Sequence, residues 1–456
     1  MKKSLNLFWM MTAAFLLLSA CSSKDNPIAD PSMGSLDATT YVAIGNSLTA
    51  GYQSGALFQE GQMYSYPNLL AKQLGSVDFV QPLMPYPGTG ELRILQTLYP
   101  SVSIISNGLT QNIPADMLTL LRPYNNLGIP GAIVYDAIDE SSILDRAQQR
   151  SNPFYMFIMR DQASFGKSMV DQAVKLQPTL LSFWLGNNDV LGYAVSGGVQ
   201  GTNTGVGGDP PRTMPTERAV FQQVIQGAFA KIKASLPNTQ VLVANIPNVT
   251  SIPFVTTVPR SIPNPTNPTQ MLNIYYRNKS GNVGIAGEND YVLLTAQEQL
   301  GKGIGLSPNA PLPSQYVLDN SEVAVTLQAV TDFNNILRTE AERNGFILVD
   351  VNALLDDIKV NGYYVAGEKY TTSFITGGLF SLDGVHLSSR GNAVVANKFI
   401  EAMNSAYGAN IRYVNFNDIP GIAAPVTSGT GKRGTTPWSL DMHFPTENLY
   451  SIFGVK

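Results

Sequence analysis

The sequence contains few of the residues that build disulfides and transition-metal sites. Its 456 residues include one cysteine, Cys21, and two histidines, His386 and His443. One cysteine excludes an internal disulfide. Zinc and related metals bind mainly through cysteine and histidine, so a transition-metal site would lack its usual ligands. We therefore expect a protein that works without a metal or another cofactor.

Charged side chains are also scarce. Asp, Glu, Lys and Arg make up 14% of the chain, against roughly 25% in typical soluble domains. The formal net charge is −4, so the composition offers no excess of basic residues for nucleic-acid phosphates. We expect no nucleic-acid partner.

A long apolar run stands at the N-terminus. Residues 7–20 are almost wholly apolar and follow Lys2 and Lys3. This run is short for a membrane span and is typical of a signal peptide. It ends in Leu-Ser-Ala-Cys, which resembles a bacterial lipobox. The resemblance implies cleavage before Cys21, a lipid on that cysteine, and, because Ser22 follows, an outer-membrane lipoprotein that faces the periplasm or the cell surface. The alternative is an ordinary secretory signal with an incidental cysteine.

The stretch from Tyr41 to Gly51 combines a strand, a turn and the start of a helix. Residues 41–44 are apolar and partly β-branched, which predicts a buried strand. Gly45 and Asn46 tolerate the positive φ of a sharp turn. Ser47 then stands on the turn, where its hydroxyl could act as a nucleophile or could merely cap the helix.

Three distant segments share this setting at the end of a strand or in a loop. They read Asn-Leu-Gly-Ile-Pro-Gly-Ala at 126–132, Trp-Leu-Gly-Asn-Asn-Asp at 184–189 and Asp-Gly-Val-His-Leu at 383–387. Each segment alone is weak, but the four in this order resemble the SGNH/GDSL hydrolases, a family of GDSL-like lipases and acylhydrolases. One residue departs from the family pattern, because Asn46 stands where the family usually has Asp.

The resemblance implies a role for five residues. Ser47 would be the nucleophile, His386 its general base, and Asp383 the carboxylate that holds the imidazole ring. The backbone N–H groups of Ser47 and Gly131 and the side-chain amide of Asn188 would form the oxyanion hole.

Several neighbouring residues are rivals or have other roles. Gly128 competes with Gly131, but the resemblance favours Gly131 because it matches the loop of the family. Asn187 competes with Asn188, and the register favours Asn188. We expect Asp189 to be a structural anchor. His443 lies in a Gly- and Pro-rich C-terminal stretch and is expected to be structural or incidental.

Strands alternate with helices along the chain, which predicts a parallel sheet covered on both faces. The family resemblance implies a flavodoxin-like three-layer α/β/α sandwich with long loop insertions. Strands are expected at 41–44, 180–183, 240–246 and 346–349, and helices at 66–75, 160–176, 216–236, 321–344 and from Ser388 or Ser389 to about 407.

The predicted domain organisation has four parts. A signal peptide spans 1–20, a tether 21–37, a hydrolase domain 38–410 and a C-terminal tail 411–456. Insertions in the domain are expected near 194–215 and 247–319, where Gly, Pro, Asn and Thr are frequent.

We interpret the chain as a serine ester hydrolase that acts on a lipid ester or an acylated carbohydrate. Loop 197–211 follows Asn188 closely and is either a substrate-binding lid or a plain surface loop. Its largest apolar residues are Val199 and Val206, which favours short acyl groups, as in an O-acetylated glycan or a small lipid ester, unless the 247–319 insertion supplies apolar walls. The alternative is an inactive SGNH-fold surface lipoprotein that binds glycans or protein partners.

Overall fold

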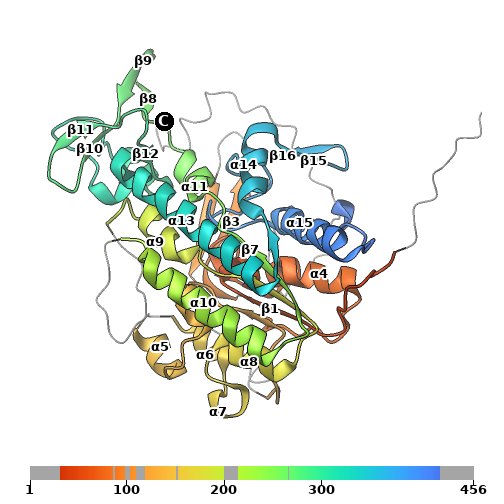
Figure 1. Ribbon diagram of the computed structural model, residues 1–456. Coiled ribbons are helices and arrows are strands. Elements are labelled where there is room, and N and C mark those ends of the chain that lie inside the picture. The colour runs from red at the N-terminus through yellow and green to blue at the C-terminus, as the bar shows by residue number, and fades with distance from the viewer. Residues whose placement is uncertain are drawn as a thin grey trace, which may run out of the picture.

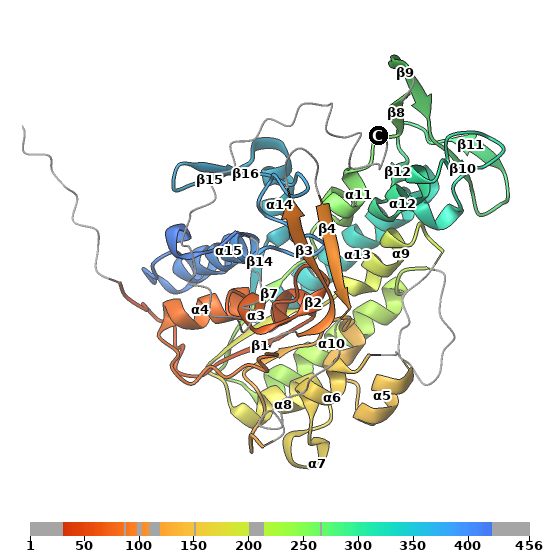
Figure 2. The same ribbon diagram turned by 180° about the vertical axis from the view of Figure 1, so that it is seen from behind.

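The centre of the molecule is a parallel β-sheet (Figures 1 and 2). The computed structural model describes residues 31–85, 88–97, 103–108, 119–149, 152–199, 214–264 and 267–421. The strands of this sheet are β1 (Tyr41–Gly45), β5 (Asn126–Gly128), β6 (Leu180–Trp184), β7 (Gln240–Ala244) and β14 (Ile347–Val349). They lie in the order β14-β7-β6-β1-β5, and each neighbouring pair is parallel.

The strand order is that of a flavodoxin-like sheet. From the β5 edge, the strands are the second, first, third, fourth and fifth of this sheet along the chain, which matches the flavodoxin order. Strands β5 and β6 lie on opposite sides of β1, so the order reverses there. Open α/β sheets bind ligands at the carboxyl ends of the strands that flank this switch point, and Ser47 follows β1 directly.

Helices cover both faces of the sheet, as the sequence predicted. Phe183 of β6 packs against Phe229 of α10 (Arg218–Ser235). The next residue, Trp184, packs against Tyr66 of α4 (Tyr66–Leu74) and against Phe399 of α15 (Ser389–Tyr407). Successive strand residues point to opposite faces, so α10 lies on one face and α4 and α15 lie on the other. Helices α8 (Met169–Leu176) and α13 (Asn320–Asn344) pack beside α10 (Figure 1).

The long helices begin and end where capping residues occur. The Asp319 carboxylate accepts hydrogen bonds from the N–H groups of Ser321 and Glu322 at the start of α13, and Gly345 ends the helix with a φ of 70°. The Ser388 hydroxyl caps α15 by accepting the Gly391 N–H. Such side-chain oxygens satisfy N–H groups that have no partner inside the helix, and the predicted ranges of both helices are confirmed.

The prediction of one helix over 160–176 is wrong. The chain forms two short helices there, α7 (Gln162–Phe165) and α8, and α6 (Phe154–Met159) ends just before this range. Arg160 and Gly166 have φ values of 48° and 111°, which no helical residue adopts. Ser168 then starts α8 through reciprocal hydrogen bonds with Asp171.

Among the described residues, three parts of the chain form β-structure outside the central sheet, and one of them is the antiparallel pair of β15 and β16 at 363–370. Strands β2 (Ala56–Leu57), β3 (Thr89–Thr97) and β4 (Ser103–Gly108) make an antiparallel sheet, although the sequence analysis assigned no element to 76–125. The 247–319 insertion packs around an apolar core of its own. It holds the hairpins β8 (Ser261–Asn264) with β9 (Asn267–Asn273) and β10 (Tyr275–Arg277) with β11 (Val283–Ile285), and β12 (Tyr291–Val292) pairs with β13 (Val317–Leu318).

The other elements are short, apart from one helix that the sequence analysis did not assign. That helix is α14 (Val351–Asn361), which lies on α15. The others are α2 (Ser47–Ala50), α3 (Gln59–Gln62), α5 (Ile143–Gln149), α9 (Asn188–Val195), α11 (Pro253–Thr256), α12 (Gln297–Gly301), β15 (Tyr363–Val365) and β16 (Glu368–Tyr370).

The packed domain extends past both predicted boundaries, 38 and 410. Ser32 pairs with Asn410 in an antiparallel bridge, and the Phe416 ring packs on Tyr363 and Tyr370. Residues 1–30, 200–213 and 422–456 lie outside the described residues, and with them Cys21, His443 and most of loop 197–211. Within the described ranges, none of the helices has both the length and the apolarity to cross a bilayer.

Candidate active site

Ser47 is the first residue of helix α2, directly after strand β1. Asn46 caps this helix, because its Oδ1 accepts the Leu48 N–H at 3.0 Å. The interpretation of Ser47 as a helix cap is therefore wrong. The expected positive φ is also absent from this turn, since Asn46 has a φ of −103°. Gly45 is needed for space instead, because a Cβ there would lie 1.9 Å from Thr49 Oγ1.

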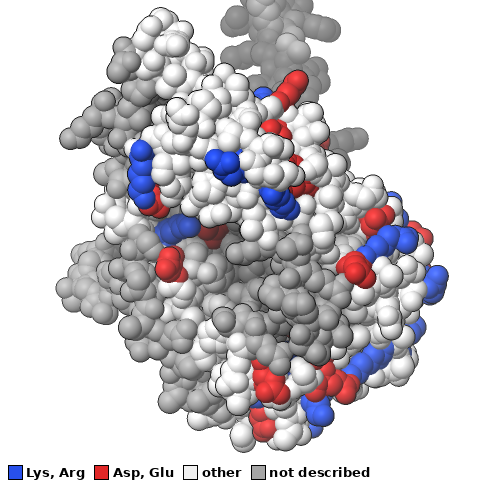
Figure 3. Space-filling model, turned by 90° about the vertical axis from the view of Figure 1, so that its left-hand side faces the viewer, with Lys and Arg blue, Asp and Glu red and all other residues white. Residues whose placement is uncertain are grey.

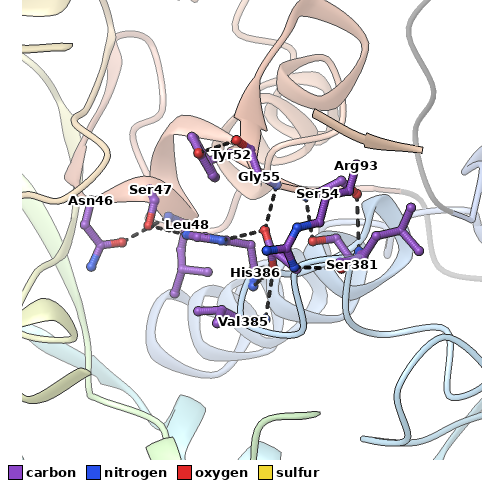
Figure 4. A network of polar contacts seen from close by, with 12 residues as sticks. Asn46, Ser47, Leu48, Tyr52, Ser54, Gly55, Arg93, Ser381, Val385 and His386 are labelled. Atoms are coloured by element: carbon purple, nitrogen blue, oxygen red, sulfur yellow. Dashed lines mark hydrogen bonds and ion pairs between the residues drawn. The ribbon is translucent and has the colours of Figure 1, made fainter. Parts of the chain in front are cut away.

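A continuous chain of hydrogen bonds joins Ser47, His386 and Asp383. Figure 4 labels the first two of these residues. Ser47 Oγ lies 2.9 Å from His386 Nε2, and His386 Nδ1 lies 2.9 Å from Asp383 Oδ2. The structure thus brings together three residues that the sequence places up to 339 positions apart.

The Asp383 carboxylate is buried and receives four hydrogen bonds. Oδ1 accepts the N–H groups of Val385 and His386 at 2.9 and 2.8 Å. Oδ2 accepts His386 Nδ1–H at 2.9 Å and the Gly55 N–H at 3.0 Å. Burial by itself raises the pKa of this carboxyl, but the charge of His386 and the hydrogen bonds from His386 and Val385 outweigh it and hold the pKa well below its usual range.

The ionised state of Asp383 fixes the tautomer of His386. An ionised carboxylate only accepts hydrogen bonds, so Nδ1 of His386 must carry the proton that it shares with Asp383. In the neutral ring Nε2 is then left with a lone pair that faces the Ser47 hydroxyl. This arrangement can remove the proton of Ser47 while the hydroxyl attacks an electrophile.

A second segment, Ser54 and Gly55, fastens the loop that carries Asp383 (Figure 4). The Ser54 N–H donates to Ser381 Oγ at 2.8 Å, and the Leu382 N–H donates to Ser54 Oγ at 3.3 Å. Strand β3 holds this segment in turn, because the Arg93 N–H donates to the Ser54 carbonyl at 2.7 Å. Sequence reasoning missed this support, since no local pattern marks a contact over 327 positions.

The Gly131 turn presents a backbone donor at the neighbouring strand end. Pro130 and Gly131 occupy the middle of a turn that the Ala132 N–H closes on the Ile129 carbonyl at 3.0 Å. Gly131 has a φ of 81°, which a type II turn requires at this position. Among the described residues, the N–H groups of Ser47 and Gly131 have no hydrogen-bond partner in the protein. Asn188 lies beside this turn, because its Nδ2 donates to the Ala132 carbonyl at 2.8 Å.

The rival residues are held in structural contacts. The Gly128 N–H donates to Asn126 Oδ1 at 2.9 Å, so this donor is already used. Asn187 is 4% exposed, and its Oδ1 accepts a hydrogen bond from Asn46 Nδ2 at 3.0 Å. An Asp at position 46 could cap α2 but could not donate a hydrogen bond to Asn187. These contacts favour the Gly131 N–H over the Gly128 N–H as the backbone donor available to a substrate, and they show that Asn187 is held by Asn46.

Asp189 connects the site to the surrounding fold. It is fully buried, and its carboxylate accepts the Val134 N–H and the Thr216 hydroxyl, each at 2.8 Å. Val134 follows the Gly131 turn by three residues, so Asp189 ties helix α9 to the segment that carries this turn. This position agrees with a structural anchor.

Charged residues do not gather into a broad patch on the face that Figure 3 shows. There, the Lys and Arg residues of the described chain are scattered among uncharged surface, and several lie next to Asp or Glu. Within the same described chain, no group of three or more His, Cys, Asp or Glu side chains is arranged to hold a metal ion.

The sequence from residue 41 to 399 matches the family of GDSL-like lipases/acylhydrolases. The chain therefore belongs to the GDSL-like lipase/acylhydrolase family. No curated protein matches the chain.

Solved structures with a similar fold include an extracellular lipase from Streptomyces rimosus, with 16% identity over 80% of this chain and 100% of the lipase and a TM-score of 0.34. A phospholipase A1 from Streptomyces albidoflavus NA297 shows 13% identity over 81% of this chain and 99% of its own, with a TM-score of 0.33. A family 3 carbohydrate esterase from Clostridium thermocellum shows 11% identity over 81% of this chain and 96% of its own, with a TM-score of 0.30. We draw no functional conclusion from likenesses at this level.

The lowered pKa of Asp383 predicts a pH-dependent contribution to stability. The pKa is lower in the folded chain than in the unfolded chain, where an Asp titrates near ~3.9. The stabilisation is therefore complete above about pH 5 and is lost as the pH falls below about 4. Asp383→Asn leaves a buried N–H without an acceptor, which costs about 1–3 kcal/mol near neutral pH. Urea unfolding at several pH values should show this difference from the wild type shrinking toward acid pH.

The matched control is Asp356→Asn, because Asp356 lies exposed on α14. This variant should stay close to the wild type at every pH. A destabilisation by Asp383→Asn that is the same at all pH values would contradict the linkage to Asp383.

Proposed function

We propose that this protein is a serine hydrolase of carboxylic esters. The observation that carries the proposal is the hydrogen-bonded chain from Ser47 Oγ through His386 to Asp383, with 2.9 Å at each step. Membership of the GDSL-like lipase/acylhydrolase family supports the same reaction class.

The reaction proceeds in two steps that use the same three residues. Ser47 Oγ attacks the carbonyl carbon of the ester while His386 Nε2 takes the hydroxyl proton. His386 then returns this proton to the leaving alcohol as the C–O bond of the ester breaks, which leaves an acyl group on Ser47. A water molecule, deprotonated by His386, attacks the acyl group and releases the acid and the Ser47 hydroxyl. Asp383 stays ionised and stabilises the imidazolium form of His386.

Three donors would stabilise the negative oxygen that forms during each attack. They are the N–H groups of Ser47 and Gly131 and the side-chain amide of Asn188. The Gly131 turn and Asn188 are held together by the hydrogen bond from Asn188 to Ala132, so the donors are in place before a substrate binds. Preorganised donors of this kind lower the barrier because they need not reorient as charge develops.

The substrate class is a carboxylic ester, on a lipid or on an acylated carbohydrate. The preference for short acyl groups was inferred from loop 197–211, most of which lies outside the described residues, so it stays a prediction from sequence. An inactive binding protein would not need a serine and a histidine in hydrogen-bond contact, and the described residues offer no observation that favours it.

Replacing the nucleophile should abolish turnover without unfolding the protein. Ser47→Ala removes the attacking oxygen, so hydrolysis of p-nitrophenyl acetate should fall to background while the thermal unfolding midpoint stays near that of the wild type. Intact-mass spectrometry after treatment with an organophosphate should show one adduct on the wild type and none on this variant.

The control is Ser321→Ala, which removes an exposed hydroxyl at the start of α13. It should retain both turnover and labelling. Undiminished hydrolysis by Ser47→Ala would rule out the assignment of the nucleophile.

Asn188→Ala tests the oxyanion hole. Loss of one preorganised donor should lower kcat by about 10²–10³ with little change in KM, because the hydrogen bond matters mainly in the transition state. Steady-state kinetics with a soluble ester measure both constants. Asn187→Ala serves as the neighbouring control and should mainly reduce stability, since it loses the bond to Asn46. A larger kcat loss in Asn187→Ala would reverse the two roles.

We also propose that Cys21 carries a lipid that anchors the protein in the bacterial outer membrane. The support is the lipobox-like sequence that ends at this cysteine. Each buried methylene of a lipid chain contributes about 0.8 kcal/mol to membrane binding, so Cys21→Ser should move the protein from the membrane fraction to the soluble fraction. Fractionation of cells that express either form provides the test, and equal membrane association of both would exclude the anchor.

A further inference from the structure

An apolar pocket opens beside the Ser47–His386 pair. Its empty volume is about 500 Å³, including the part that is open to solvent. Leu48, the residue after Ser47, and Val385, the residue before His386, both line it and are partly exposed. Figure 4 shows both side chains next to the polar contacts of the site. The immediate neighbours of the nucleophile and its base therefore belong to the lining of the pocket.

The wall of the pocket is apolar throughout. Leu354 of α14 lies near the surface, whereas Val394 of α15 and Ile252 are buried deeper. Trp184 carries the only side-chain polar group among the lining residues, and its indole N–H already donates to the Asn245 carbonyl at 3.0 Å. A pocket with this lining offers no hydrogen bond to a sugar or a charged group. It suits an aliphatic chain.

The pocket and Ser47 lie at the same edge of the central sheet. Leu48 follows β1, Trp184 ends β6, Pro247 follows β7, and Val351 follows β14, and all four residues line the pocket. The strands are parallel, so these positions share the carboxyl edge where open α/β sheets bind ligands. A chain attached to a carbonyl at Ser47 would pass Leu48 and enter the pocket without crossing the sheet.

We propose that this pocket receives the alkyl chain of the ester substrate. The proposal rests on the proposed esterase function and assigns that function to esters with medium-length aliphatic chains. It runs against the short-acyl preference inferred from loop 197–211. The apolar walls come from elsewhere, namely from α14, from α15 and from Pro247 and Ile252 at the start of the 247–319 insertion.

The alkyl chain in the pocket could belong to the acyl group or to the alcohol of the ester. Leu48 borders the nucleophile, where the acyl chain begins, and Val385 borders His386, which gives its proton to the leaving alcohol. Both sources present the same chemistry to the pocket. Each methylene that becomes buried should raise kcat/KM by up to about fourfold, and the rise should end once the pocket is filled, because side chains of α14 and α15 bound it.

Two series of esters distinguish an acyl chain from an alcohol chain in the pocket. In the first, p-nitrophenyl esters of acetate, butyrate, hexanoate, octanoate and decanoate vary the acyl chain. In the second, acetate esters of ethanol, butanol, hexanol and octanol vary the alcohol, and released acid is measured at constant pH. We expect kcat/KM to rise with chain length in one series. A flat or falling profile in both series would overturn the proposal.

A variant of the pocket wall tests where the alkyl chain lies. Leu354→Gln keeps the size of the side chain but places a polar amide in the apolar wall. The ratio of kcat/KM for the octanoate ester to kcat/KM for the acetate ester should therefore fall at least fivefold. If the pocket receives the alcohol, the ratio for octyl acetate to ethyl acetate should fall by the same factor. The matched control is Leu327→Gln, because Leu327 lies on α13, is 38% exposed and does not line the pocket. It should keep the wild-type ratio. A chain-length profile that Leu354→Gln leaves unchanged would show that the chain binds elsewhere.

A binding measurement separates this proposal from the proposed function. Calorimetry with Ser47→Ala compares octanoate and acetate esters without turnover. We expect the octanoate ester to bind more tightly than the acetate ester, and we expect Leu354→Gln to weaken that binding. This result would support the pocket as the binding site of the alkyl chain even if the wild-type protein hydrolysed no ester. Hydrolysis without any chain-length dependence and with equal binding of both esters would overturn the pocket assignment and leave the esterase function standing.

Discussion

The arrangement of the site depends on one buried carboxylate. Asp383 sits away from water, where an ionised group is costly unless it is fully hydrogen-bonded. Its four donors come from its own loop, from the His386 ring and from Gly55. The same contacts fix the loop, the ring orientation and the His386 tautomer. The position of the His386 ring beside Ser47 therefore depends on the hydrogen bonds that the Asp383 carboxylate accepts.

The sequence predicted the fold, and the positions of Ser47 and Asn188 after strands, because these signals are local. Buried parallel strands read as short apolar runs, and the residues directly after such strands meet at one edge of the sheet. Ser47 follows β1 in this way, and Asn188 comes after β6. Helix α13 carries its own capping residues at both ends. None of these features requires knowledge of a distant contact.

The features that sequence reasoning missed depend on contacts between distant segments. The Ser54 support for the Asp383 loop joins residues 327 positions apart, and neither residue belongs to a recognisable pattern. Gly45 was taken as a conformational requirement, whereas its role is to leave room for Thr49. The apolar pocket escaped notice because Val394 and Leu354 read as ordinary core positions of helices, and periodicity cannot separate a packed face from the wall of a cavity.

The distance along the chain between Ser47 and His386 has a consequence for biosynthesis. The serine emerges early during translation, but the histidine follows 339 residues later. During most of its synthesis the polypeptide therefore carries a nucleophilic hydroxyl without a base to activate it. The hydrogen bond between Ser47 and His386 can form only after the segment with His386 has been synthesised and has docked beside β1.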